Sequence, residues 1–129
     1  REECLNLGKP DPGEYPAQGP IFLWVDKDPD QAWETLFPHV AHQLASYSAW
    51  TTEAFGRPAG PYAGDMTLET VKQSGAYQVL TPEQTLSMID SLGAHSVVYL
   101  NPLLAGIDPD VSWRMLKLFE AEVYPNLRR

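Results

Sequence analysis

Basic residues are scarce in this chain. Of its 129 residues, 9 are Lys or Arg and 17 are Asp or Glu, which gives a formal net charge of -8. Binding to a phosphate backbone or to an anionic bilayer depends on clustered positive charge, and no run of Lys or Arg supplies it. The composition therefore predicts that the partners include neither nucleic acid nor membrane.

Cysteine and long apolar runs are also in short supply. The one cysteine, Cys4, cannot form an internal disulfide, so we expect a reducing compartment and a cytoplasmic location. The longest apolar runs, at 21–25 and 96–100, are far shorter than the about 20 residues that a membrane-spanning helix needs. Because the chain starts at Arg1, inside a stretch typical of a helix end, we expect a fragment or a processed chain without a signal peptide.

Several motifs of catalysis and of metal binding are missing. Neither of the glycine-rich phosphate motifs, GxGxxG and GxxxxGK[ST], occurs, and neither does the GxSxG motif of serine hydrolases. His39 and His42 stand three residues apart on an expected helix, but no acid is placed at a helical spacing as a third ligand. We therefore predict no metal site and expect this pair either to face solvent or to meet a part of a larger fold that lies outside this chain.

What the sequence does contain is a pattern of strands and helices in alternation. The runs at 21–25 and 96–100 are continuously apolar, which is typical of strands covered on both faces in a parallel sheet. A third, shorter extended piece is expected at 77–80. We divide the single domain fragment into a helix end (1–8), a loop (9–20), a strand and helix (21–50), an insertion or lid (51–66), helices (67–93) and a last strand and helix (94–129).

Each of the two apolar strands is followed by a helix that opens with Asp-Pro-Asp. Asp28 and Asp108 can cap free amide groups, the proline presets φ, and the second acid lies near the positive end of the helix dipole. These roles account for the paired acids at 28 and 30 and at 108 and 110. We therefore do not assign the acids to acid-base catalysis.

A series of short motifs follows in order along the chain: Asp28-Pro29 with Ala32-Trp33 after a strand, a helix with Pro38-His39, His42 and Tyr47, the helix start Thr81-Pro82-Glu83, the Asn-Pro-Leu loop after the final strand, and the closing "LKLFEAEVYPNL". In their order and spacing these motifs resemble the C-terminal part of the luciferase-like monooxygenase family. The resemblance covers most of the chain from Gly19 onward.

The resemblance implies a fold and a cofactor. Members of this family fold as a (β/α)8 TIM-type barrel and use reduced flavin mononucleotide (FMN) or a deazaflavin coenzyme in oxidoreductase chemistry. A complete barrel takes about 250 residues. The fold class expected here is thus α/β, the C-terminal portion of such a barrel, with two or three parallel strands and flanking helices. Its partner would be the upstream half of the same barrel, and the small-molecule substrate would bind the full protein. By itself the chain would be inactive and bind no cofactor.

The loop after the last strand holds the candidate site residues. Barrel ligands bind at the carboxyl ends of the strands, so Asn101, Leu103 and Gly106 are candidates for cofactor binding or for the pocket rim. Two structural roles remain open: Asn101 before proline can open a turn, and Gly106 can meet a need for positive φ. The insertion around 60–65 is a candidate lid.

A second interpretation is a non-catalytic binding or assembly module that associates with itself. Two strands of the buried type would leave open edges, which invite pairing with another chain. Trp113 lies off the apolar stripe of the last helix and would be exposed without a neighbour. A homo-oligomer therefore stays a prediction beside the enzyme.

Overall fold

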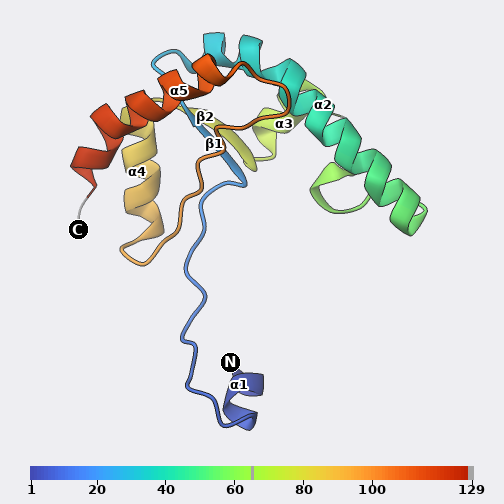
Figure 1. Cartoon of the computed structure of the whole chain (residues 1–129), viewed down its shortest axis with the longest axis vertical. Coiled ribbons are helices and arrows are strands. Elements are labelled where there is room, and N and C mark those ends of the chain that lie inside the picture. Colours follow the sequence, from blue (N-terminus) through green and yellow to red (C-terminus); the bar gives the residue numbers. More distant parts are fainter. Residues whose placement is uncertain (65, 128–129) are drawn as a thin grey trace.

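The computed structural model describes residues 1–64 and 66–127 (Figure 1). Asp65 of the candidate lid and the last two residues of the expected final segment lie outside the described residues. The elements are α1 (Glu2–Asn6), β1 (Phe22–Val25), α2 (Pro29–Phe55), the short helical turn η1 (Gly60–Tyr62), α3 (Leu68–Gln73), β2 (Tyr77–Leu80), α4 (Pro82–Leu92), α5 (Pro109–Leu118), η2 (Phe119–Val123) and η3 (Tyr124–Asn126).

Two parallel strands lie among the helices, which confirms the α/β class. Phe22 of β1 is opposite Tyr77 of β2, and Val25 is opposite Leu80. All four residues of β1 are buried, as its continuous apolar run predicts. In Figure 1, α5 crosses the two strands, and an extended arm over residues 9–20 carries α1 away from them.

The expected strand at 96–100 is reduced to two isolated parallel bridges. Val97 is bridged to Gln18, and Leu100 is bridged to Leu23 of β1. Leu23 pairs with Gln78 of β2 as well, so the segment at 97–100 must lie along the opposite edge of β1. The spatial order is therefore β2, β1, then 97–100. Consecutive strands of a barrel lie side by side in chain order, which would put this segment next to β2.

The prediction of a regular last strand is thus wrong, and the local chemistry explains why. The segment runs into Pro102, which has no N–H for a ladder bond, so pairing ends soon after the bridge at Leu100. Tyr99, between the two bridges, is 53% exposed because no described element covers its side chain fully.

Helix starts follow the capping chemistry of the sequence. The Asp28 carboxylate accepts the backbone N–H of Gln31 at 3.1 Å, and the Asp108 carboxylate accepts the N–H of Asp110 at 2.9 Å. At the start of α4, Thr81 and Gln84 exchange the two hydrogen bonds of a capping box. The acids at 28 and 108 therefore serve as helix caps, as predicted.

The helix after β1 is longer than expected. α2 continues through Phe55 and ends at Gly56, whose φ of +73° suits a left-handed cap. Residues 51–55, expected in the insertion, are thus helical. The hydroxyls of Thr51 and Thr52 donate to the carbonyl oxygen of Ser48, at 3.0 and 2.7 Å, within the helix. Pro38 is accommodated inside α2.

The core forms where α2 and α5 meet β1. On one face of α2, four large side chains are buried, namely those of Trp33, Leu36, Val40 and Leu44. They join Trp24 of β1 and Met115 of α5 in one hydrophobic cluster. Trp113 of α5 is 59% exposed, as its place off the stripe predicts. None of the helices in the described residues combines the length and the apolar character that crossing a bilayer requires.

Leu36 provides a test of this core. The side chain is 1% exposed, so Leu36→Ala removes buried methyl groups and leaves a cavity. We expect the free energy of unfolding to fall by about 2–5 kcal/mol, measured by urea denaturation followed by circular dichroism. Leu7→Ala is the matched control, because Leu7 is 63% exposed and should change stability by less than about 0.5 kcal/mol. Equal losses in the two variants would contradict the packing.

Candidate functional site

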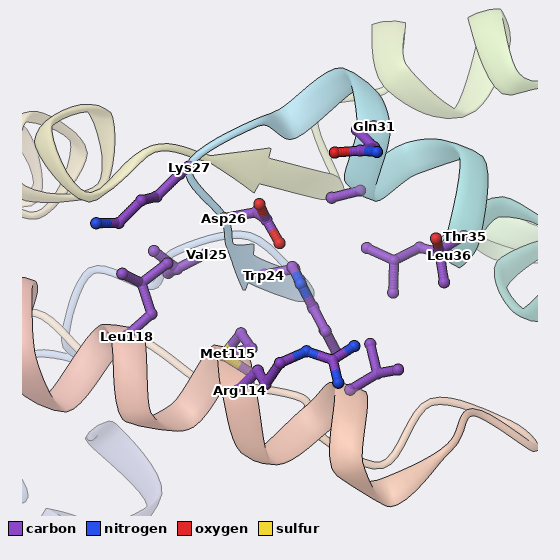
Figure 2. A pocket seen from close by; sticks show the side chains of 12 residues that line it. Trp24, Val25, Asp26, Lys27, Gln31, Thr35, Leu36, Arg114, Met115 and Leu118 are labelled. Carbon is purple, nitrogen blue, oxygen red and sulfur yellow. The ribbon is translucent and has the colours of Figure 1, made fainter.

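A groove opens at the carboxyl end of β1, between the first turns of α2 and the side of α5 that faces them (Figure 2). Its volume is about 580 Å³, and we call it the β1 groove. Trp24, Leu36 and Met115 supply apolar lining. The carboxyl ends of parallel strands are the usual place for ligands in α/β folds, so this groove is the first candidate site.

The turn that leaves β1 places one acid in the groove. Asp26 follows the strand directly, and its carboxylate accepts the backbone N–H of Asp28 at 3.0 Å. This bond turns the chain from the strand into α2. The side chain of Asp26 is half-buried and points between the strand end and α2 in Figure 2. Its position is therefore fixed by the local fold.

Two cations line the same groove, and only one of them is paired. Lys27 forms an ion pair with Glu122 at 2.7 Å. The hydrogen bond that Lys27 donates to the Glu122 carboxylate, together with the negative charge of that carboxylate, raises the pKa of Lys27. Arg114 of α5 has no ion pair among the described residues, and Figure 2 shows its guanidinium in the space between α5 and α2. Arg114 is thus the cation in the groove that can meet an anionic group.

The groove is suited to binding and lacks a catalytic pair. Its lining contains no His, Cys or Ser, and Asp26 is already engaged in the turn. No group of three His, Cys, Asp or Glu side chains that could hold a metal occurs in the part of the chain that the structure describes. Of the two cations in the groove, Lys27 is already paired with Glu122, and the Asp26 carboxylate would repel a flavin phosphate held by Arg114. The groove by itself does not fit FMN.

The predicted loop residues lie elsewhere. Asn101 donates its side-chain N–H to the carbonyl oxygen of Ile21 at 2.6 Å, which ties the loop to the residue before β1. Together with Leu103 it lines a second cavity, of about 180 Å³, near the starts of β1 and β2. Leu103 is 85% exposed. The structure therefore brings Asn101 and Leu103 together, away from the β1 groove.

Gly106 is separate from that cavity and lies beside α2. Its φ is +74°, and a Cβ at this position would be 3.8 Å from Nδ1 of His39. The backbone conformation thus accounts for glycine here, which is the structural role left open by the sequence.

His39 makes a structural contact that the sequence did not predict. Its Nδ1 lies 2.8 Å from the carbonyl oxygen of Ala105, so the Nδ1–H tautomer donates to the loop. His42, one turn further along, is exposed. His39 precedes the buried Val40 in α2, and this position beside the buried face of the helix is the sequence feature that could have indicated the contact.

Aromatic side chains surround the smaller cavity. Tyr62 of η1 stacks on Tyr47 of α2 with ring centroids 4.8 Å apart, and Tyr77 stacks on Phe22 at 5.4 Å. Burial raises the pKa of Tyr77, and the hydroxyls of Tyr62 and Tyr47 raise it further. The stretch expected as an insertion or lid is thus held against α2 by a tyrosine pair.

Comparisons with known proteins give no match to this chain among family models, curated proteins or solved structures.

Removal of the His39 contact should loosen the loop. We expect His39→Ala to lower the free energy of unfolding by about 1 kcal/mol, because the variant leaves the Ala105 carbonyl without its donor. His42→Ala is the matched control on the same helix and should be close to neutral. Urea denaturation measures both values, and equal effects would argue against the contact.

The raised pKa of Tyr77 predicts that the chain becomes less stable at high pH. A pKa above the ordinary value of 10.0 means that the folded chain holds the phenolic proton more tightly than the unfolded chain. This contribution is therefore complete below about pH 10 and is lost as the pH rises further. We expect Tyr77→Phe to flatten the fall in unfolding free energy above about pH 10, whereas Tyr124→Phe, at a side chain that is 59% exposed, should not. Parallel falls in both variants would contradict the assignment.

Proposed function

We propose that this chain is the C-terminal segment of a luciferase-like oxidoreductase of the monooxygenase type, which uses reduced FMN or a deazaflavin coenzyme. The observation that supports this most is the parallel pairing of β1 with β2 through the crossover helix α2. A parallel pair joined by a helix is the building unit of a (β/α)8 barrel. The family resemblance carried by Asp28-Pro29 and Thr81-Pro82-Glu83 adds to this support.

Large exposed side chains fit an incomplete barrel. Tyr99, Leu103 and Trp113 are 53%, 85% and 59% exposed. In the proposed full-length protein the upstream half of the barrel would cover Tyr99 and Trp113 and would carry most of the groups that hold the flavin.

A complete barrel would require a different strand order from the one described here. A complete barrel places the segment at 96–100 beside β2, whereas its bridges here join it to β1 and to Gln18. Only two isolated bridges among the described residues would have to break for the segment at 96–100 to change its neighbour. The outer edge of β2 would then receive this segment once the remaining strands close the ring.

Within the full-length enzyme, this chain would supply scaffold and part of the pocket rim. The loop at 101–107 is held on one side by the bond of Asn101 to Ile21 and on the other by the bond of His39 to Ala105. A loop tied at both ends can present Leu103 to a bound small molecule. The isolated chain would bind no flavin and would be inactive.

The experiment is a titration of the full-length native protein with FMN and, separately, with a deazaflavin coenzyme. Quenching of coenzyme fluorescence should report one bound molecule per chain for one of the two. The 129-residue chain should show no quenching in the same range. A folded full-length protein that quenches neither coenzyme would overturn the proposal.

A variant of the loop sharpens this titration. We expect Leu103→Ala in the full-length protein to weaken binding of the coenzyme or substrate by about tenfold, which corresponds to partial loss of one buried leucine. Leu7→Ala is the matched control at an exposed position directly after α1 and should leave binding unchanged. Unchanged binding in both variants would remove Leu103 from the pocket rim.

A self-associating module is the second candidate, and the open edge of β2 favours it. The two-stranded sheet leaves this edge without a described strand partner. Such a short sheet is marginal by itself, so a second chain is one way to complete it.

A further inference from the structure

The outer edge of β2 lies open along a groove. The floor of this β2 groove is the strand itself with its flanking residues, from Gly75 to Thr81, and its volume is about 630 Å³. Trp33 of α2 and Lys72 of α3 stand on one wall, and Gln84 of α4 closes one end. The groove thus follows the strand for its whole length, as an additional strand would.

The direction of the backbone groups on β2 follows from its ladder with β1. Phe22 donates its N–H to the carbonyl oxygen of Ala76, and Asp26 donates to that of Leu80, both at 3.0 Å. Successive residues of a strand point to opposite edges. The amide and carbonyl groups of Tyr77 and Val79 therefore point away from β1, into the β2 groove.

These outward groups are complementary to a second copy of themselves. If two β2 strands meet antiparallel about a two-fold axis at Gln78, Tyr77 of each copy lies opposite Val79 of the other. Each of these two pairs exchanges both backbone hydrogen bonds, which fills every outward amide and carbonyl of the two residues. A two-fold axis perpendicular to the sheet also keeps the covered faces of both copies on the same side.

The side chains agree with this pairing. Tyr77 and Val79 are each 6% exposed and belong to the core cluster, so the cross-strand Tyr–Val pairs would extend that core from one copy to the next. Gln78 points to the other face, is half-buried, and donates one side-chain N–H to the carbonyl oxygen of Gly75 at 3.1 Å. On the axis, its second N–H and its side-chain oxygen would meet the Gln78 of the other copy. An amide can donate to an identical amide and accept from it.

Charge in the β2 groove does not oppose a second copy, although the whole chain carries -8. The charged residues that line the groove are Asp30 and Lys72, and these two form an ion pair at 3.1 Å. Lys72 also lies 5.8 Å from the centre of the Trp33 ring. This wall is therefore neutral, and the strand at its foot carries no charged side chain or proline to block pairing.

We propose that the outer edge of β2 is a dimer interface, at which the strand of a second copy of this chain pairs antiparallel about Gln78. The two sheets would then form one continuous sheet across the two-fold axis. The inference does not rest on the proposed enzymatic function. In a complete barrel, residues 96–100 would cover the outer edge of β2. In this chain, the second copy covers that edge.

The first test is the mass of the chain in solution, by sedimentation equilibrium over a series of concentrations. We expect a reversible dimer of twice 14.4 kDa. Gln78→Lys puts two like charges opposite each other on the axis and should raise the dissociation constant by about tenfold or more, and so should Gln78→Glu. A mixture of the two variants should restore the dimer, because opposite charges then meet. Circular dichroism checks that each variant folds.

Gln73→Lys is the matched control for these variants. Gln73 is exposed on α3, and its side chain donates to Glu69 rather than lining the β2 groove. We expect the dimer of this variant to be as tight as that of the unchanged chain. Equal weakening by Gln73→Lys and Gln78→Lys would overturn the proposed interface, because net charge alone would then be the cause.

A disulfide tests the register. Opposed residues at this kind of antiparallel position have Cα atoms about 4.5 Å apart, within the range that a disulfide spans. In a chain with Cys4→Ser, we expect Gln78→Cys to form a covalent dimer on mild oxidation, whereas Gln73→Cys should not. A monomer at every concentration, or an unaffected dimer in Gln78→Lys, would overturn the proposal. If the chain stays monomeric and binds a peptide of another sequence at the edge of β2 instead, the proposal is also wrong. None of these outcomes alters the flavin titration of the full-length protein.

Discussion

The burial of β1 is the constraint on which the rest of the structure depends. Its four side chains are at most 2% exposed, so a strand of this length needs cover on both faces and neighbours on both edges. α2 follows β1 after a short turn that Asp26 stabilises, which places the first turns of the helix against Trp24. α5 then reaches the same tryptophan through Met115, and the β1 groove is the space that the two helices leave at the strand end.

Local chemistry explains which parts of this fold the sequence predicts. A helix start depends on the residues next to it, so Asp28, Thr81 and Asp108 could be identified as caps from the sequence alone. The continuous apolar run at 21–25 likewise predicts a buried strand. The sequence predicts too early an end for α2 because the stretch at 51–66 is rich in glycine and proline and shows no helical periodicity. In the structure, hydroxyl bonds to Ser48 lie within the added turn, and the cap at Gly56 ends the helix after Phe55.

Contacts between distant residues are the part that local patterns cannot provide. Asn101 was predicted at a pocket rim from its place after an apolar run, but its hydrogen bond goes to Ile21, 80 positions away. The bond between His39 and Ala105 spans 66 positions. Strand order has the same origin: the sequence at 96–100 favours an extended backbone, and only the fold decides whether β1 or β2 is its neighbour. These contacts move the predicted loop away from the β1 groove.

The open edge of β2 connects the two proposals for this chain. A parallel strand with a neighbour on one side leaves half of its backbone groups unused, and on β2 these are the groups of Tyr77 and Val79. In a complete barrel the strand that follows in the chain would satisfy them, and in a dimer the same strand of a second copy would do so. The two arrangements compete for identical hydrogen bonds and cannot coexist on one molecule. If the full-length enzyme closes its barrel, it must therefore lose the β2 interface that the shorter chain presents.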